Sequence, residues 1–125
     1  GVMLERLGGS LYEERSRKGV GDFPLSARVT GYWDRRDTEV DLVAINEPGR
    51  VIRFGSCKRS PTKLLADVNN FKKHVERFLE VHSLYTSWKV EYVGISPVLD
   101  ASARKVLTRH DVIPQDLGDL MKNLT

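Results

Sequence analysis

The sequence is poor in cysteine and has no long apolar run. Its single cysteine, Cys57, excludes an intrachain disulfide and a zinc site built from several cysteines. No apolar run reaches the roughly 20 residues that a membrane-spanning helix requires, and the first residues lack the charged-then-apolar pattern of a signal peptide. We therefore expect a cytoplasmic protein that contacts no membrane.

Several common enzyme signatures are also missing. The chain has no GxxxxGK[ST] phosphate loop, no HExxH zinc helix and no GxSxG nucleophile elbow. Its three histidines, His74, His82 and His110, do not have the spacing of a ligand set. The corresponding nucleotide-binding, zinc-protease and serine-hydrolase chemistries thus have no support in the sequence.

What is present is the composition of one ordinary globular domain. The chain has 125 residues, of which 40% are hydrophobic and 30% are charged, without a long block of one charge. Because domains of about 100 to 150 residues are the commonest size, we predict a single domain over residues 1–125. The formal net charge of +3 is compatible with a polyanionic partner, although many proteins without a nucleic-acid role share such a balance.

Hydrophobic periodicity predicts an α/β fold. Apolar residues at helical spacing predict helices over residues 2–17 and 61–82, and two shorter helices near 101–109 and 116–124, separated by the segment DVIP. Alternating apolar, β-branched and aromatic residues predict strands over residues 27–33, 38–47, 50–58 and 88–96. The first three strands should form an antiparallel meander. The fourth follows a helix and should pair in parallel.

Polar side chains gather where the second and third strands end. Alternate residues of a strand share a face, so Glu39 and Asp41 should point one way, and Ser56 should share a face with Lys58. Whether the two sets meet depends on the register of the strands. Carboxylate oxygens are the ligands that Mg²⁺ prefers, and a nearby lysine can orient or help deprotonate water. The arrangement suits metal-dependent hydrolysis of phosphodiesters.

These residues resemble a known family. The segment EVDLVAINEPGRVIRFGSCK, with LE at positions 4 and 5 and YWD closing the first strand, resembles the PD-(D/E)XK, or restriction-endonuclease-like, nuclease superfamily. More narrowly, it resembles the uncharacterised C-terminal domain of archaeal and bacterial AAA-type ATPases. The resemblance implies a core of helix, three strands, helix and strand, with a mixed central sheet flanked by helices.

The resemblance also implies roles for individual residues. Asp41, Lys58 and Glu5 match the catalytic positions of the superfamily, and Asp41 and Glu5 match metal ligands. The cofactor would be Mg²⁺ or Mn²⁺ in an active enzyme, and there would be none in an inactive one. The implied partners are DNA and an ATPase domain in the same or a partner chain, and a homodimer is left open.

Ser56 departs from the family pattern. It stands where the pattern has Asp or Glu, and a neutral hydroxyl is a poorer ligand for a hard divalent cation than a carboxylate. Glu39 could substitute only with different geometry, because two residues of a strand span about 7 Å. We therefore predict a nuclease-like domain that associates with nucleic acid and is catalytically impaired. An active metal-dependent DNA endonuclease and a non-catalytic interaction or regulatory module of an ATPase are the alternatives.

Basic residues near the predicted ends of the strands form a candidate rim for nucleic acid. The rim comprises Arg35, Arg36, Arg59 and Lys63. A row of cations of this kind would neutralise backbone phosphates. An arginine-rich turn is, however, also typical of a segment that only faces solvent.

Overall fold

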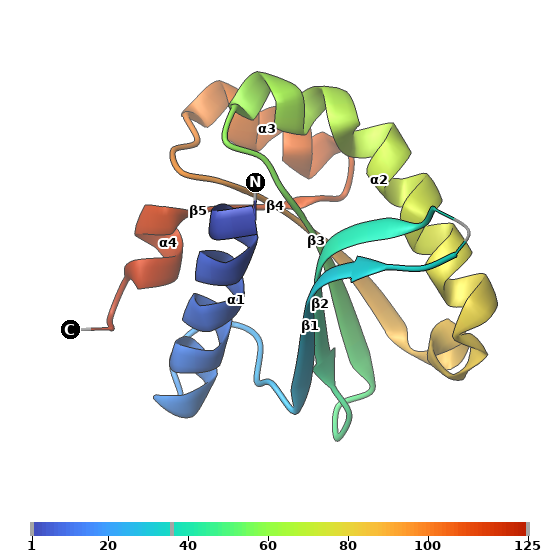
Figure 1. The fold of residues 1–125 in the computed structure, drawn as a ribbon. Helices are drawn as coiled ribbons and strands as arrows, with labels where there is room; N and C mark the ends of the chain where they lie inside the picture. The colour runs from blue at the N-terminus through green and yellow to red at the C-terminus, as the bar shows by residue number, and fades with distance from the viewer. Residues whose placement is uncertain (1, 36, 125) are drawn as a thin grey trace.

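A five-stranded sheet runs through the centre of the molecule, with the strands in the order β1-β2-β3-β4-β5 (Figure 1). The computed structural model describes residues 2–35 and 37–124. The strands are β1 (Ala27–Trp33), β2 (Glu39–Asn46), β3 (Val51–Cys57), β4 (Lys89–Ser96) and β5 (Ile113–Asp116). The helices are α1 (Val2–Arg17), α2 (Pro61–Val81), α3 (Ala101–Arg109) and α4 (Leu117–Met121), with a short 3₁₀ helix η1 (Ser83–Ser87).

The sheet is mixed, as predicted. β1, β2 and β3 form an antiparallel meander, and β4 pairs with β3 in parallel after the crossover through α2. The strand β5, parallel to β4, was not predicted from the segment DVIP. It is only four residues long and half-buried and includes Pro114, so it has neither the length nor the alternation of a recognisable strand. Correspondingly, α4 is shorter than the helix predicted over 116–124.

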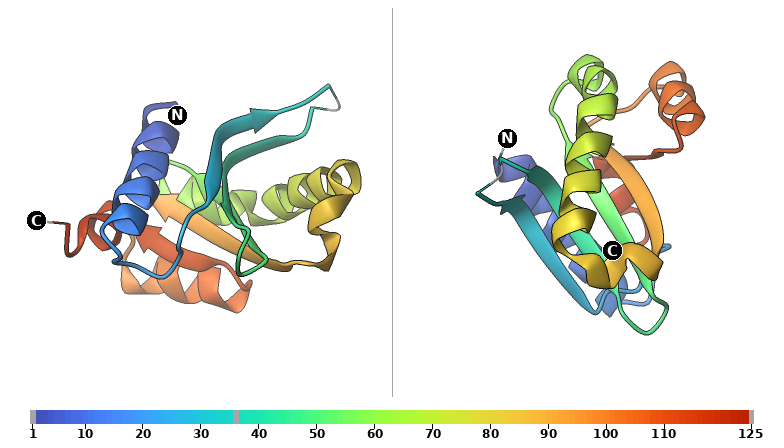
Figure 2. Two further views of the ribbon diagram at one scale, coloured as in Figure 1. Left: turned by 90° about the horizontal axis from the view of Figure 1, so that it is seen from below. Right: turned by 90° about the vertical axis from the view of Figure 1, so that its right-hand side faces the viewer.

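The two faces of the sheet are covered by different helices (Figure 2). On one face, α1 and α4 pack on the sheet through a cluster that includes Leu4, Tyr12, Leu42 and Leu120. On the other face, α2 buries the predicted apolar stripe of Leu64, Val68, Phe71, Val75 and Phe78. The Ser60 hydroxyl caps α2 by accepting a hydrogen bond from the Lys63 amide, as its place before Pro61 predicts.

The glycine pair in α1 allows the helix to lie close to the sheet. A Cβ atom on Gly9 would lie 2.7 Å from Thr30 Oγ1, and one on Gly8 would lie 3.6 Å from Ile95 Cδ1. The close approach explains why two residues that weaken an isolated helix are found here. It also brings the first turn of α1 beside the strands that carry the candidate site.

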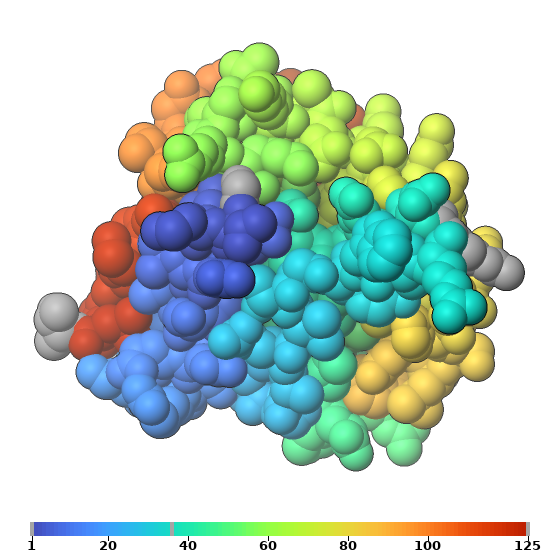
Figure 3. Space-filling model, in the orientation of Figure 1, coloured from blue at the N-terminus to red at the C-terminus, as the bar shows by residue number. Residues whose placement is uncertain are grey.

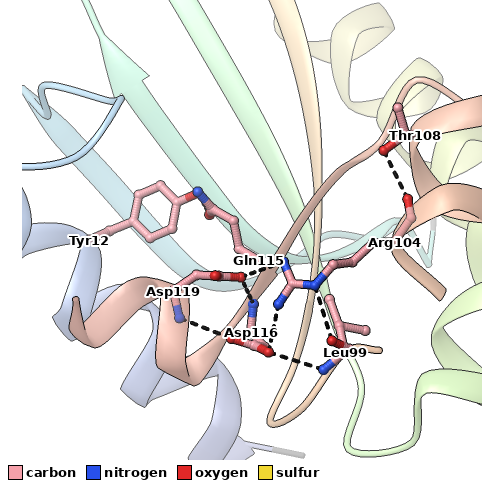
Figure 4. Close-up of polar contacts among 7 residues, drawn as sticks. All are labelled: Tyr12, Leu99, Arg104, Thr108, Gln115, Asp116 and Asp119. Atoms are coloured by element: carbon pink, nitrogen blue, oxygen red, sulfur yellow. Dashed lines mark hydrogen bonds and ion pairs between the residues drawn. The ribbon is translucent and has the colours of Figure 1, made fainter. Parts of the chain in front are cut away.

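The C-terminal elements are joined by one arginine. Arg104 of α3 donates hydrogen bonds to Asp116 Oδ2 at 2.7 Å and to Asp119 Oδ2 at 2.8 Å (Figure 4). Asp116 also caps α4, and the amide of Leu99 donates to the same Asp116 oxygen at 3.1 Å. This network fixes the short β5–α4 segment against α3. None of the helices in residues 2–35 and 37–124 combines the length and apolar character needed to cross a bilayer.

A buried arginine holds the loop after α1 against the sheet. Arg53 on β3 has only 2% of its surface exposed. Its guanidinium donates two hydrogen bonds to the Asp22 carboxylate at 3.0 and 3.2 Å, one to Glu91 Oε1 at 3.0 Å, and one to the Tyr12 hydroxyl at 3.1 Å. Each side of the guanidinium is therefore matched by an acceptor.

Removing this arginine should destabilise the fold. We expect Arg53→Ala to lower the free energy of unfolding by about 3 kcal/mol, because two carboxylates lose their counter-charge beside the core. Arg53→Lys should recover only part of the loss, since an ammonium cannot make the forked contact with Asp22. Urea denaturation measures both variants against the wild type. An unchanged midpoint for Arg53→Ala would contradict this role.

Candidate functional site

The candidate site lies where β2 separates from β3. The ladder between the two strands ends at the pair Leu42–Gly55, and beyond it the β1–β2 hairpin continues as a projecting two-stranded ribbon (Figure 2). Asp41 is the first residue past this point. Its Oδ2 accepts a 2.7 Å hydrogen bond from the backbone amide of Cys57, so a carboxylate replaces a strand partner for the end of β3.

The ribbon twists at this point, and the simple alternation predicted for β2 is wrong there. Val40 packs in the cluster under α2 together with Val43, whereas Leu42 lies in the cluster under α1. Gly31 lies across from Asp41, between the Thr30–Leu42 and Tyr32–Val40 pairs, and has a φ of +70°. Such a φ favours glycine and lets the chain turn sharply. The change of face leaves Asp41 at the mouth of a groove.

The three residues that the family resemblance singles out come together in this groove. Lys58 Nζ lies 3.9 Å from Asp41 Oδ2, and both side chains are partly exposed. The Glu5 side chain, from the first turn of α1, is close enough to share a hydrogen bond with Asp41 when one of the two carboxyls is protonated. A helix and two strands thus bring a carboxylate pair and an ammonium to one place.

The closeness of the two carboxylates alters the titration of Glu5. Partial burial raises the pKa of Glu5, and the charge of Asp41 and the hydrogen bond to it raise this pKa further, while Lys58 opposes the shift. Two like charges at short range disfavour the state in which both carry charge at once. A bound cation between them would remove this penalty.

A stability measurement tests the repulsion. A raised pKa in the folded state means that ionised Glu5 costs stability as the pH rises above its ordinary value of 4.5. Without divalent metal, we expect Glu5→Gln to raise the melting temperature at pH 7.5 by roughly 2 °C. This is the shift expected when one interaction between two partly exposed charges is removed. The difference should vanish near pH 4, where wild-type Glu5 is protonated. A lower melting temperature at pH 7.5 would show that the carboxylate pair is not repulsive.

Cys57 borders the groove but does not supply a nucleophile. Only 1% of its surface is exposed, and it faces the α1 side of the sheet, away from Ser56, as predicted. Burial raises the pKa of the Cys57 thiol, and the charges of Asp41 and Glu5 raise it further. The thiol is therefore neutral at physiological pH, and a neutral thiol is a weak nucleophile.

A carboxylate from α2 lies beside Ser56. Ser56 is buried, and its hydroxyl donates a 3.1 Å hydrogen bond to Oδ2 of Asp67. The other Asp67 oxygen accepts a 3.4 Å bond from the side chain of Asn70. The position that lacks an acid on β3 is thus in direct contact with an acid from the neighbouring helix. Glu39, considered above as the substitute, is exposed at the rim of the groove and makes no such contact with Ser56 in the described residues.

Asp67 was missed in the sequence, although a signal for it exists. It belongs to a polar stripe of α2 that adjoins the apolar stripe. Each residue of the polar stripe comes directly before a buried residue, and the stripe consists of Lys63, Asp67, Asn70 and His74. This spacing places the four side chains along one side of the helix. His74 Nδ1 accepts a 3.0 Å bond from the Glu39 amide, so the stripe faces the β1–β2 hairpin.

The groove is open to solvent and carries both signs of charge. It has a volume of about 660 Å³, and its charged lining consists of Glu5, Glu39, Asp41, Asp67, Lys58, Arg59 and Lys63. On the face shown in Figure 3, the blue surface of α1 lies beside the cyan surface of the hairpin, with the green start of α2 above them.

The described residues of the predicted basic rim lie in two different places. Arg59, which follows β3, and Lys63, in the first turn of α2, border the groove. Arg35 is exposed in the turn of the hairpin. Arg36 lies outside the described residues.

The donor set fits a hard divalent cation. Mg²⁺ keeps several of its waters and is commonly held by one or two carboxylates together with substrate phosphates. Glu5 and Asp41 supply two facing carboxylates in an accessible groove. In the described part of the chain, no three His, Cys, Asp or Glu side chains already stand close enough to enclose a metal ion.

Comparisons with known proteins bear on the fold. No protein-family model matches the sequence, and no curated protein matches it significantly. Among solved structures, a repair endonuclease from Pyrococcus abyssi superposes with a TM-score of 0.58 at 20% identity, over 90% of this chain and 46% of that one. The chain therefore spans about half the length of that enzyme.

A second solved structure agrees. The small subunit of a heterodimeric restriction endonuclease superposes with a TM-score of 0.51 at 11% identity, over 98% of this chain and 75% of that one. Both similarities extend over nearly the whole chain, and the mixed sheet between two helical layers is common to the predicted and the observed architecture. The chain has a restriction-endonuclease-like fold.

Proposed function

We propose that this nuclease-like domain hydrolyses phosphodiester bonds of nucleic acid with the help of a divalent metal ion. The observation that carries the proposal is the meeting of Glu5, Asp41 and Lys58 in one open groove, with Lys58 Nζ 3.9 Å from Asp41 Oδ2. Glu5 and Asp41 would hold Mg²⁺ or Mn²⁺, and Asp67 borders the same groove. The fold of two endonucleases supports the reaction class.

Each group has a distinct task in this proposal. The metal ion, when bound, would stabilise negative charge on the scissile phosphate and lower the pKa of a coordinated water. Lys58 is partly exposed beside Asp41, and its ammonium orients the attacking water and attracts the phosphate. Arg59 and Lys63 neutralise the adjoining phosphates along the groove.

The contact between Ser56 and Asp67 favours an active site over an impaired one. The prediction of impairment depended on the missing carboxylate at position 56. Asp67 delivers a carboxylate to the same hydroxyl at 3.1 Å, and it borders the groove together with Asp41. Asp67 thus adds a carboxylate to the groove in which Glu5 and Asp41 meet.

A cleavage assay tests the proposal. The purified chain is incubated with single-stranded and duplex DNA and RNA in Mg²⁺ or Mn²⁺, with Ca²⁺ and a chelator as controls, and the products are separated by electrophoresis. We expect cleavage in Mg²⁺ or Mn²⁺ and none with the chelator. Absence of cleavage on every substrate in both metals would end the proposal. Cleavage that survives the chelator would show that the reaction needs no metal.

A further inference from the structure

A large aromatic side chain is exposed beside the proposed site. Trp33, the last residue of β1, has 63% of its surface exposed. It pairs across the hairpin with Glu39, so the two side chains lie on the same side of the ribbon, and Glu39 borders the groove. In the part of the chain that the structure describes, the indole makes no contact with another aromatic ring.

The residue before Trp33 holds the ribbon in place. The Tyr32 ring packs edge-on against Phe78 at 4.8 Å between ring centroids, and its hydroxyl bonds to Asp34 at 3.0 Å and to His82 at 2.9 Å. Because neighbouring residues of a strand point to opposite faces, this anchoring under α2 directs Trp33 away from the core. The indole is presented on a fixed backbone, which lowers the entropic cost of binding a flat partner.

The surroundings of Trp33 favour a nucleic acid as that partner. Arg35 is exposed two residues further along, and three cations, Lys58, Arg59 and Lys63, border the same groove as Glu39. An exposed aromatic ring next to phosphate-attracting cations is the combination that binds single strands, in which bases stack on the ring while the backbone follows the cations.

We infer that Trp33 stacks on an unpaired base next to the phosphate that is cleaved, so that the substrate is single-stranded or locally unpaired nucleic acid. This inference rests on the proposed function. Gly31 lies opposite Asp41 on the neighbouring strand. Trp33 follows Gly31 by two residues, which is a distance of about 7 Å along the strand and matches the rise of roughly two stacked nucleotides. In an intact duplex, both faces of each internal base are covered by its neighbours, and no face is free for the indole.

The two tryptophans of the chain make the inference testable by fluorescence. In Trp88→Phe, Trp33 is the sole tryptophan. We expect its emission to be quenched when oligothymidylate is added in Ca²⁺, and to change little when a blunt duplex of equal length is added. The matched control, Trp33→Phe, leaves Trp88 as the sole reporter, and its emission should stay unchanged with both.

Affinity gives the second readout. We expect Trp33→Ala to weaken binding of the single strand about 10-fold, and Trp33→Phe, which keeps a stacking ring, to weaken it by less than about 3-fold. Equal quenching by the duplex, or unchanged affinity in Trp33→Ala, would overturn the inference. Self-association of the wild type that Trp33→Ala abolishes would also overturn it, because Trp33 would then belong to a protein contact.

The outcomes separate this inference from the proposed function. The binding measurements need no cleavage, so quenching without any nuclease activity would leave the stacking site standing and remove the reaction. Metal-dependent cleavage without quenching would leave the reaction standing and remove the stacking site.

Discussion

Asp41→Asn should reduce metal-dependent cleavage by about 1,000-fold or more, the scale seen when a group that stabilises transition-state charge is removed. The substitution preserves shape, and the asparagine oxygen can still accept the bond that Asp41 takes from the Cys57 amide at 2.7 Å. What it removes is the negative charge that faces Glu5 and Lys58. Initial rates in Mn²⁺ measure the effect.

The control for this variant is its stability. Since the backbone contact is kept and one repulsive charge is lost, the variant should unfold at the same urea concentration as the wild type or slightly higher. A variant that is folded and fully active would place the reaction somewhere other than this groove.

Removing the Asp67 carboxylate, or moving it to position 56, should also have a large effect on the cleavage rate. We expect Asp67→Asn to lower the cleavage rate about 100-fold, because the groove loses a negative charge near the metal site while the hydrogen bond from Ser56 can still form. Ser56→Asp combined with Asp67→Asn returns an acid to β3, where the superfamily pattern has it. This double variant should recover at least about 10-fold of the lost rate.

The comparison of single and double variants separates two accounts of the site. If Asp67 replaces the acid missing at position 56, the effects of the two substitutions are strongly non-additive, as expected for residues in contact. An Asp67→Asn variant with the wild-type rate would show that Asp67 only packs against Ser56. Activity that appears for the first time with Ser56→Asp would show that the wild-type site is impaired.

Much of this fold could be predicted because its signals are local. The apolar stripe of α2 and the alternation of β1 correspond to patterns of burial that each segment carries by itself. The meander predicted that β2 and β3 are neighbours, but the meeting of Asp41 and Lys58 depended on the register of the strands, which the sequence left open. The resemblance to the nuclease superfamily predicted the place of Glu5, which periodicity alone did not reveal.

The rest depended on how elements pack in space. Asp67 reaches Ser56 only because α2 docks on the sheet at a particular height and rotation, which no single segment encodes. The twist at Gly31 depends on its positive φ, and the sequence does not show which glycines adopt such a φ. The association with an ATPase, the homodimer and the binding of DNA stay predictions, which co-purification, sedimentation and binding assays can test.

The most direct test of the central claim is a calorimetric titration of the chain with Mn²⁺ at pH 7.5, beside Asp41→Asn. The claim is that Glu5 and Asp41 hold a divalent cation in the groove between α1, the β1–β2 hairpin and α2. It predicts saturable binding by the wild type, and affinity lowered at least about 10-fold in the variant, because one of few anionic ligands is lost. Equal affinity in the two proteins, or no binding by a folded wild type, would contradict it.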